Sequence, residues 1–303
     1  MRILIIGSQG FVGSYILLEL VNKFGVIPIY STSLTDTKLL GSSHCSDIRL
    51  TELNIRSLSN FIYSNQITCV VNAAGVIGSE PDSNPDMKIA EIIINSVNLL
   101  KKKPTLIHIG SSSEYTSQEM GSNSNELSEC HPSSAYGKNK LAVTKFLLNA
   151  SAQLNFKLCV CRVFNIIGPG MNKKTILGRL HDEVVIDRKT KVDFLSLASY
   201  RDYIDIRDVS NAVVKLIVCI DGTAFFPKIL NVGSGTALEV RSLINQIKYA
   251  SNNFFEFTEL DSSYGDKNII WQQANIDQIK AIINWDIKYT MSQSIEYFLN
   301  KAD

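Results

Sequence analysis

Three glycines, Gly7, Gly10 and Gly13, follow the short apolar run 3–6 and open a segment with helical periodicity. Between a strand and a helix, such a pattern provides a tight turn, close approach of the backbone to a pyrophosphate, and close packing of helix on strand. The N-terminus of the following helix would present free backbone N–H groups to phosphate. The pattern predicts a strand–turn–helix unit that binds a dinucleotide; the alternative is a tight turn with no ligand.

The first half of the chain alternates short apolar runs with helical patterns, which is typical of βαβ units around a parallel sheet. We predict strands over residues 2–6, 26–30, 68–72, 105–109 and 158–163, and helices over 12–24, 58–65, 88–101 and 135–154. Two later apolar segments, near 204–206 and 228–232, could return to the same sheet. The predicted fold class is α/β, a doubly wound parallel (Rossmann) sheet with a smaller, mainly C-terminal substrate lobe.

After residue 165 the pattern loosens, and from about residue 236 it indicates helices and loops. We therefore predict a dinucleotide-binding domain formed by residues 1–165 plus 201–219. A substrate-binding lobe would comprise residues 166–200 plus 220–303. Ligands of such sheets bind beyond the carboxyl ends of the strands, at the point where the strand order reverses.

Composition excludes several classes of function. The net charge of +1 gives no basic excess for nucleic acid, and 45% hydrophobic with 19% charged residues is an ordinary globular mixture. The first apolar run ends after residue 6, too early for a signal peptide, and no apolar stretch approaches a membrane span. The six cysteines and four histidines show no ligand-like spacing. We expect a cytoplasmic protein with no metal site and no nucleic-acid or membrane partner.

Tyr136 and Lys140 stand four residues apart in a predicted helix and would share one face, about 5–6 Å apart. Such a pair is common by chance and gains meaning from the glycine turn and from Ser111. A free phenol titrates near pH 10, too high for efficient proton sharing at neutral pH, and a cation one turn along favours the phenolate. Ser111 would donate a hydrogen bond to the developing oxyanion. The set predicts hydride transfer on an alcohol or ketone, with a nicotinamide cofactor supplying the difficult step.

Five ordered segments, with the features above, resemble the extended short-chain dehydrogenase/reductases, specifically the NAD-dependent epimerase/dehydratase family that acts on nucleotide sugars. The similarity runs through nearly the whole chain. The segments are 72–75 (Asn-Ala-Ala-Gly), Asn95 in a helix, 162–170 (Arg-Val-Phe-Asn-Ile-Ile-Gly-Pro-Gly), 201–208 (Arg-Asp-Tyr-Ile-Asp-Ile-Arg-Asp) and 231–235 (Asn-Val-Gly-Ser-Gly).

The resemblance implies roles for individual residues. The catalytic residues would be Ser111, Tyr136 and Lys140, because the family places its catalytic hydroxyl four residues before a tyrosine, here Tyr115. On an extended segment Ser113 would share the face of Ser111 and Ser112 would point away. Ser112 is the reserve candidate for the case in which the register slips by one residue. The expected cofactor contacts are Gly7, Gly10, Phe11, Val12, Gly13, Ser31, Thr32, Asn54, Ile55, Ala73, Ala74, Gly75, Asn95, Tyr136, Lys140 and Phe164.

The substrate side would use Ser111, Ser112, Asn165 and Arg201. Asn165 and Arg201 would hold the nucleotide diphosphate, the guanidinium as a charge-assisted donor. The alternative for Arg201 is a surface ion pair with Asp202 or Asp205.

Three departures from the family bear on the ligands. The usual Asp-Ile adenine contact is Asn54-Ile55, the glycine after Tyr115 is Thr116, and Lys267 is the only cation near the expected C-terminal arginine. The end of the second predicted strand reads Tyr-Ser-Thr-Ser, residues 30–33, with no acid for an NAD ribose and no base for a 2′-phosphate. The choice between NAD and NADP therefore stays open, with a slight lean to NADP.

Several reactions share this set of residues. We favour reduction of a 4-keto-6-deoxy sugar nucleotide, because Glu114-Tyr115 and the segment 164–171 look more like those reductases. The alternative is a 4-epimerase with retained NAD. A 4,6-dehydratase is disfavoured because Ser113 stands where the family's acid would be, although a bent loop could bring Glu114 into place. A cofactor-binding sensor without turnover would usually have lost Tyr136 or Lys140.

Family members commonly dimerise through two helices, which here correspond to residues 88–101 and 135–154. An apolar stripe of Ala142, Phe146, Leu147 and Ala150 is consistent with this, and is equally consistent with a helix face that packs on the sheet. The resemblance implies a homodimer and a nucleotide-sugar substrate.

Overall fold

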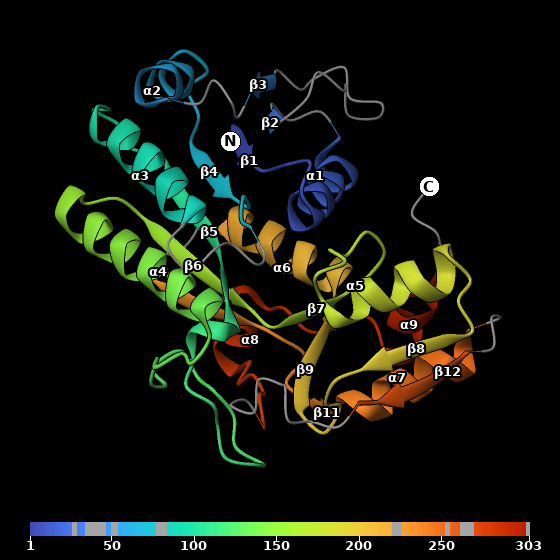
Figure 1. Cartoon of the computed structure of the whole chain (residues 1–303). Coiled ribbons are helices and arrows are strands. Elements are labelled where there is room, and N and C mark those ends of the chain that lie inside the picture. Colours follow the sequence, from blue (N-terminus) through green and yellow to red (C-terminus); the bar gives the residue numbers. More distant parts are fainter. Residues whose placement is uncertain are drawn as a thin grey trace. The chain divides into compact units, whose positions relative to one another are not determined.

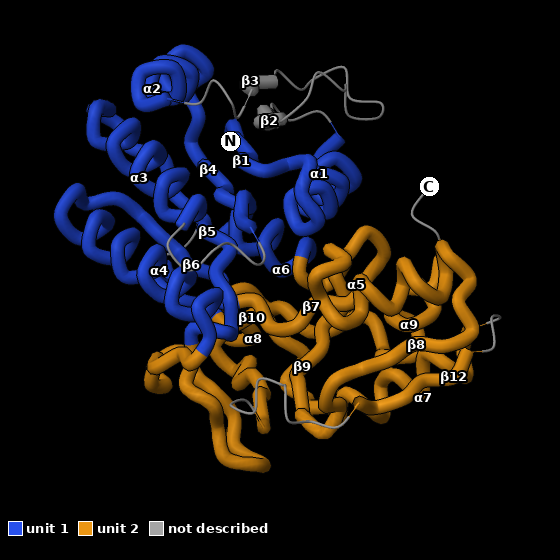
Figure 2. Tube along the Cα trace, viewed as in Figure 1, with its two compact units in different colours: residues 1–114, 134–162, 210–230 blue, residues 115–133, 163–209, 231–303 orange. Residues whose placement is uncertain are grey.

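The computed structural model describes residues 1–25, 54–76, 84–219, 226–251, 255–260 and 270–300, together with the backbone of 29–33 and 47–49. Contacts divide the chain into two compact units (Figure 2). The first unit comprises Met1–Glu114, Ser134–Arg162 and Ser210–Leu230, and the second Tyr115–Ser133, Val163–Val209 and Asn231–Asp303. The domain boundaries proposed from the sequence stay a prediction.

The first unit is built on a seven-stranded sheet with strand order β10-β6-β5-β4-β1-β2-β3 (Figure 1). Strands β1 to β5 pair in parallel along this order. The order reverses at β1, which pairs with β2 on one side and β4 on the other. The predicted α/β fold is confirmed. The strands are β1 (Ile3–Ile6), β2 (Ile29–Ser33), β3 (Asp47–Arg49), β4 (Cys69–Asn72), β5 (Thr105–Ser111), β6 (Leu158–Val163) and β10 (Ile229–Val232).

Helices lie on both faces of this sheet, as Figure 1 shows: α2, α3 and α4 on one and α1 and α6 on the other. The apolar side chains of Leu4, Val70 and Leu106 belong to one buried cluster with Leu147 and Ala150 of α4. Of the predicted apolar stripe, Leu147 and Ala150 thus face the core and Phe146 packs partly against it, whereas Ala142 is exposed. The helices are α1 (Phe11–Phe24), α2 (Ile55–Ser64), α3 (Pro85–Asn98), α4 (Ala135–Leu154) and α6 (Ile206–Cys219).

Two helices begin three residues earlier than the sequence predicted, because polar side chains cap them. Asn54 accepts the backbone N–H of Ser57, whose hydroxyl in turn accepts the N–H of Asn54, so α2 begins at Ile55. Asn84 accepts the N–H of Met87, and Pro85 occupies the first helical position of α3. The predicted strand 26–30 is β2, described from Ile29; residues 26–28 lie outside the described part of the chain.

One strand prediction was wrong. Residues 228–232 do return to the main sheet as β10, but 204–206 do not. They belong to β9 (Tyr200–Asp205) and to the start of α6, and β9 pairs with β7 (Asn165–Ile167) and β11 (Ala237–Glu239) in a separate three-stranded sheet. An apolar run identifies a buried strand but not its partner, which depends on contacts distant in sequence.

The second unit has its own apolar core, in which Phe194, Phe255 and Phe298 are almost completely buried. Around it lie the three-stranded sheet and a parallel pair of strands, β8 and β12. The remaining elements are α5 (Ile176–His181), which continues into a π-helical turn (Asp182–Ile186), β8 (Lys191–Phe194), α7 (Val240–Ala250), β12 (Glu256–Glu259), α8 (Asp277–Ile283) and α9 (Met291–Leu299).

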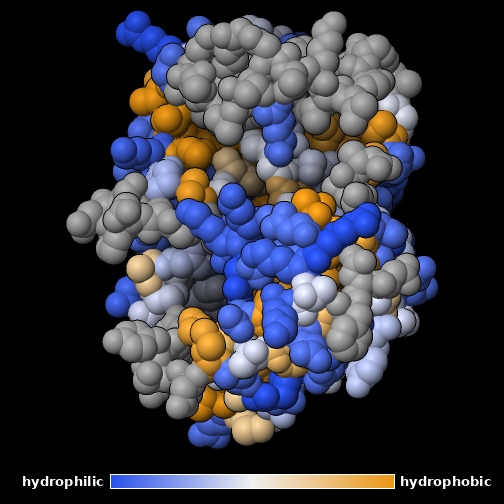
Figure 3. All heavy atoms as spheres, turned by 45° about the vertical axis from the view of Figure 1, so that its right-hand side comes forward, coloured by the Kyte–Doolittle hydropathy of each residue, from blue (hydrophilic) through white to orange (hydrophobic). Residues whose placement is uncertain are grey.

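The face shown in Figure 3 carries hydrophobic residues in several separate groups among hydrophilic ones. Among the helices that the structure describes, none is long and apolar enough to cross a membrane.

Candidate active site

The glycine turn lies at the carboxyl end of β1. Gly7 has a φ of 85°, and a Cβ there would lie 2.6 Å from the backbone nitrogen of Ala74, so this position requires glycine. A Cβ on Gly13 would collide with the carbonyl of Gly7. Gly10, the N-cap of α1, provides no side-chain cap for the first turn. Phe11 and Val12 begin the helix and are half-buried. This glycine cradle is packed backbone against backbone and leads directly into the N-terminus of α1, and a turn of this kind is a usual binding place for the pyrophosphate of a dinucleotide.

Three predicted cofactor contacts, Ala73, Ala74 and Gly75, follow β4 and lie beside the glycine turn. We refer to these three residues as the predicted cofactor wall. Its conformation is held by Asn72, whose side-chain oxygen accepts the N–H of Ala74 (3.3 Å). The amide nitrogen of Asn72 lies 3.0 Å from Nδ1 of His108 in β5. Because that amide can only donate, Nδ1 accepts and the imidazole is neutral. Burial, reinforced by the charge of Lys140, lowers the pKa of His108 to about 3.

Ser111 ends β5 and is nearly buried. Its hydroxyl oxygen accepts the backbone N–H of Ser113 (3.1 Å), which leaves its own O–H available to donate. The next three residues, Ser112–Glu114, form a 3₁₀ turn. The alternation of faces expected for an extended segment is therefore wrong, and the bend considered for Glu114 does occur.

Glu114 is completely buried, and each of its two carboxylate oxygens accepts a hydrogen bond. One oxygen accepts the N–H of Ser111 (3.0 Å), and the other accepts Nε of Arg162 in β6 (2.9 Å). A Cβ on Gly110 would lie 2.8 Å from the first oxygen, so the carboxylate occupies the space that this glycine leaves. The buried pair Glu114–Arg162 fixes the backbone of Ser111 and leaves Glu114 no open face toward a ligand.

Tyr136 and Lys140 lie on α4, which begins where Ser134 accepts the N–H of Gly137 (3.0 Å). Helix α4 packs against the 3₁₀ turn after Ser111. As the spacing predicted, the two side chains share a face: Nζ of Lys140 is 5.7 Å from the ring centroid of Tyr136. Tyr136 is half-buried, whereas Lys140 is buried and pairs with Asp86 of α3 (2.7 Å).

The charge of Lys140 is set by its surroundings. Burial by itself lowers the pKa of this ammonium group. Tyr136, Asp86 and Glu114 outweigh that effect, so the pKa lies above its ordinary value of 10.5. Lys140 is therefore a cation throughout the neutral range.

Three predicted site residues lie in the second unit. Phe164 is buried with Tyr115 and Ala274. The amide nitrogen of Asn165 donates to Gln272 Oε1 (2.8 Å) and to the carbonyl of Asp202 (3.1 Å).

Arg201 donates to the carbonyl of Tyr200 (2.9 Å). The two acids considered as its partners are engaged elsewhere. The carboxylate of Asp202 accepts the backbone N–H groups of Ser234, Gly235 and Ala274, and Asp205 binds Arg207.

Other predicted cofactor residues lie apart from these clusters. Asn54 caps α2, and Ile55 is exposed. Asn95 is exposed on α3, about 14 Å along the helix from Asp86. Ser31 and Thr32 lie in β2, but their side chains are outside the described part of the structure, as is Lys267.

Sequence reasoning missed three groups that shape the site: Asp86, the Glu114–Arg162 pair and the Asn72–His108 pair. The partners of Lys140 and Glu114 are 54 and 48 residues distant in sequence. The only available signal was a polar residue in or beside an apolar strand, as with His108 and Arg162. Buried polar groups need partners, but the sequence does not name them.

The parallel sheet, the glycine cradle at its switch point and the Ser111/Tyr136/Lys140 set define a dinucleotide-binding α/β protein. The family model for the NAD dependent epimerase/dehydratase family matches residues 3–233. The chain belongs to this family.

Relatives extend over almost the whole chain. The dTDP-6-deoxy-L-talose 4-dehydrogenase (NAD(P)(+)) of Kitasatospora kifunensis is 24% identical over 97% of this chain and 93% of its own length. Among solved structures, the UDP-glucose 4-epimerase of Thermus thermophilus in complex with NAD has a TM-score of 0.82 at 17% identity, covering 99% of this chain and 98% of that one. RMD from Pseudomonas aeruginosa, complexed with NADPH, has a TM-score of 0.77 at 18% identity, with coverage of 99% and 98%.

Proposed function

We propose that the chain reduces the 4-keto group of a nucleotide-linked sugar, with a 6-deoxy sugar as the preferred substrate and Tyr136 as the proton donor. The observation that carries the proposal is the arrangement on α4 and β5. A serine hydroxyl with a free proton, a half-buried phenol and a buried cation belong to one unit of the fold. When bound, a reduced nicotinamide supplies the hydride.

The side chains would divide the work at the carbonyl oxygen. Ser111 donates its O–H to this oxygen and stabilises the negative charge that develops on it. Tyr136 gives a proton to the same oxygen, forming the alcohol. Lys140 stabilises the phenolate that remains, because its charge lies 5.7 Å from the ring centroid. In the reverse direction the phenolate removes the proton.

Glu114 supports reduction over dehydration. A dehydratase needs a carboxyl group that reaches the sugar and expels water. Both oxygens of Glu114 are directed to Arg162 and to the backbone of Ser111, and the side chain is completely buried. Ser113, the next candidate position, has no acidic group.

The name of one relative supports a 4-keto sugar. The 4-dehydrogenation of a dTDP-6-deoxysugar, which that name describes, is in reverse the reduction of a 4-keto group. Asn165 and Arg201 would then bind the diphosphate of the nucleotide sugar. The second candidate, 4-epimerisation with retained NAD, uses the same residues, and its support is the likeness to UDP-glucose 4-epimerases in sequence and in fold.

The cofactor would be NADPH or NADH, held by the Gly7–Gly13 turn and by Ala73, Ala74 and Gly75. Residues 30–33 contain no acid to bind a ribose 2′-hydroxyl, so we give slight preference to NADPH. The ratio of kcat/KM for the two reduced cofactors measures this preference directly.

Purified protein, assayed for bound cofactor and then for turnover of a panel of nucleotide sugars, tests the proposal. A reductase consumes added NADPH or NADH only with a 4-keto substrate. Tightly retained NAD and sugar interconversion without net oxidation would instead identify an epimerase. Tyr136→Phe is the matched control: it should abolish turnover and leave cofactor binding intact. Inactivity of the unaltered protein on every substrate would favour a cofactor-binding sensor.

We also propose a homodimer through α3 and α4. Ala142 on α4 and Leu99, which follows the last residue of α3, are exposed, whereas Leu147 and Ala150 are buried in the core. Light scattering distinguishes a dimer from a monomer, and a monomer contradicts this proposal.

A further inference from the structure

Asp86 is buried at the start of α3 with both oxygens occupied. Oδ2 pairs with Nζ of Lys140 at 2.7 Å, and Oδ1 accepts the backbone N–H of Val76 at 3.0 Å. The side chains of Asp86 and Lys140 are each only 7% exposed. The carboxylate thus joins the catalytic helix to the segment that follows the predicted cofactor wall.

The position of Asp86 is not explained by helix capping. Asn84 already caps α3 by accepting the N–H of Met87. A carboxylate near a helix N-terminus is favoured by the helix dipole, which makes the aspartate tolerable there, but its oxygens are directed to Lys140 and Val76. The interaction that orients Asp86 is the one with the lysine.

Gly75 makes room for the pair. A Cβ on Gly75 would lie 2.9 Å from Nζ of Lys140 and 3.5 Å from Oδ2 of Asp86. The ion pair is therefore packed directly against the backbone of the predicted cofactor wall. A side chain at this position would push the ammonium group away from its place.

Among the described residues, four titratable groups act on or face Lys140: Tyr136 on its own helix, Asp86 on α3, His108 on β5 and Glu114 on the 3₁₀ turn. His108 is neutral, and Glu114 already forms a buried pair with Arg162. Asp86 is thus the acid, among the described residues, that forms an ion pair with Lys140. A buried ammonium group without such a partner tends to lose its proton.

We propose that Asp86 is a positioning residue of the hydride-transfer site, which keeps Lys140 charged and holds it against Gly75 beside Tyr136. The proposal rests on the function proposed above for Tyr136 and Lys140. It adds a third member to that set, so that a phenol, an ammonium group and a carboxylate act as one unit. Asp86 itself touches neither sugar nor hydride, and acts through the lysine.

The pH dependence follows from the charge of Lys140. With Asp86 present, the raised pKa keeps the ammonium group charged beyond pH 10.5. Asp86→Asn keeps the size and an acceptor for Val76 but removes the negative charge. Desolvation then acts with less opposition, and the pKa of Lys140 falls. As the pH is raised, activity that depends on the cation should therefore be lost at a lower pH in this variant than in the unaltered protein.

The experiment follows the titration of Lys140 by NMR of protein with isotopically labelled lysine, with Lys140→Arg to assign the signal. In Asp86→Asn we expect the midpoint to fall by at least about one pH unit. Asp86→Glu, which retains the charge, should recover most of the shift, and Glu91→Gln, on the exposed face of the same helix, should leave the midpoint unchanged. A midpoint in Asp86→Asn equal to or above that of the unaltered protein overturns the proposal.

The pH profile of turnover provides the second readout. In Asp86→Asn, kcat should fall by roughly tenfold or more, with a high-pH limit at lower pH, while KM for the cofactor changes less. A lower melting temperature with an unchanged pH profile of turnover would indicate that Asp86 is purely structural and would contradict the proposal. The titration needs no substrate. If the midpoint of Lys140 falls in Asp86→Asn but the unaltered protein turns over no nucleotide sugar, then Asp86 does keep Lys140 charged and the proposed function is contradicted.

Discussion

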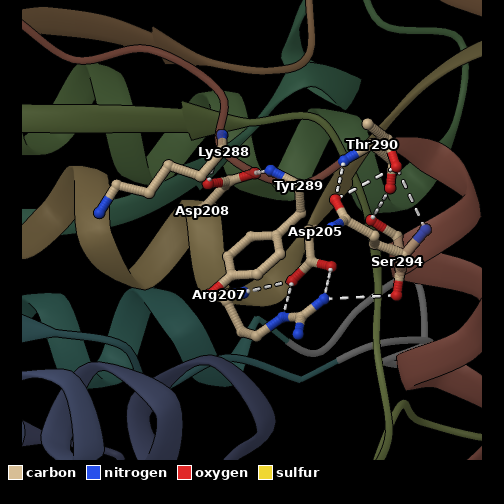
Figure 4. Close-up of polar contacts among 8 residues, drawn as sticks. Asp205, Arg207, Asp208, Lys288, Tyr289, Thr290 and Ser294 are labelled. Atoms are coloured by element: carbon tan, nitrogen blue, oxygen red, sulfur yellow. Dashed lines mark hydrogen bonds and ion pairs between the residues drawn. The ribbon is translucent and has the colours of Figure 1, made fainter.

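Two aspartate ion pairs of the described residues, one in each unit, are built differently. In the first unit Asp86 binds Lys140 through one contact, and both side chains are buried. In the second, Asp205 binds Arg207 through two parallel hydrogen bonds of 2.9 and 2.7 Å, with the guanidinium 26% exposed (Figure 4). The rings of Tyr289 and Tyr297 lie 3.6 and 4.0 Å from that guanidinium.

We propose that this difference separates a structural clamp, Asp205–Arg207, from a pair that serves the chemistry, Asp86–Lys140. The cluster of Asp205, Arg207, Tyr289 and Tyr297 has several redundant contacts. Tyr289 lies just before α9 and Tyr297 lies in α9, so the cluster connects this helix to the end of β9 and the start of α6. The Asp86–Lys140 pair has little redundancy and lies beside Tyr136, and a buried pair contributes little net stability. A pair that is costly to bury and weakly stabilising is better explained by the chemistry it prepares.

The largest effect is expected from Lys140→Met, which removes the cation and leaves Asp86 buried without its partner. Turnover should fall at least about 100-fold, and the free energy of unfolding by about 3 to 5 kcal/mol, as measured by urea denaturation. Combining it with Asp86→Leu should restore part of the stability but none of the activity. If the single variant were as stable as the unaltered protein, the pair would not be a buried ion pair in solution.

His108 should make the first unit sensitive to acid. Its pKa is about 3 in the folded protein against an ordinary value of 6.5, so between these values the unfolded chain binds a proton that the folded chain does not. Stability therefore falls as the pH drops from 6.5 to 3, by about 1.4 kcal/mol per pH unit at most. The unfolding free energy of the unaltered protein and of His108→Gln, measured across this range, should converge toward low pH. Parallel curves would contradict the neutral, buried histidine.

Asp208 should give the second unit the opposite dependence. Its carboxylate is buried and accepts the backbone N–H groups of Lys288 and Tyr289 (3.1 and 3.2 Å; Figure 4), yet burial raises its pKa to about 6 from 3.8. Between these values the folded state binds the extra proton. Stability from this group is complete below pH 3.8 and is lost as the pH rises through 6, by about 3 kcal/mol at most. Asp208→Asn should remove this slope in urea titrations at a series of pH values.

The smallest effect is expected from Arg207→Lys. A lysine retains the charge but loses the two-pronged contact and most of the stacking on Tyr289 and Tyr297. We expect a loss of about 1 kcal/mol in thermal or urea unfolding and unchanged cofactor-dependent turnover. A fall in kcat with unchanged stability would show that this clamp also serves the chemistry and would remove the contrast between the two pairs.

Much of the first unit could be predicted because its signals are local. The glycine turn, the alternation of strands and helices, and the bounds of helix 135–154 depend on periodicity and on capping by Ser134. The shared face of Tyr136 and Lys140 depends on helix geometry alone. The cap that Asn54 forms on α2 is a local contact with Ser57, and the cofactor contact expected of Asn54 stays a prediction.

Other features escaped because their determinants are not local. Glu114 was weighed as a catalytic acid, and it is bound to Arg162, 48 residues later. Asp86 gave no signal, since an acid near a helix start is ordinary and only the packing of α3 on α4 brings it to Lys140.

The most direct test of the proposed reduction uses a deuterium label on the hydride of the cofactor. The protein is given NADPH or NADH labelled at the reactive carbon of the nicotinamide, together with a 4-keto-6-deoxy nucleotide sugar, and the product is examined by mass spectrometry and NMR. We predict deuterium at C4 of the sugar, one atom for each cofactor oxidised, and none with Tyr136→Phe. Sugar converted without deuterium from the added cofactor would contradict reduction and identify an isomerase that keeps its own NAD.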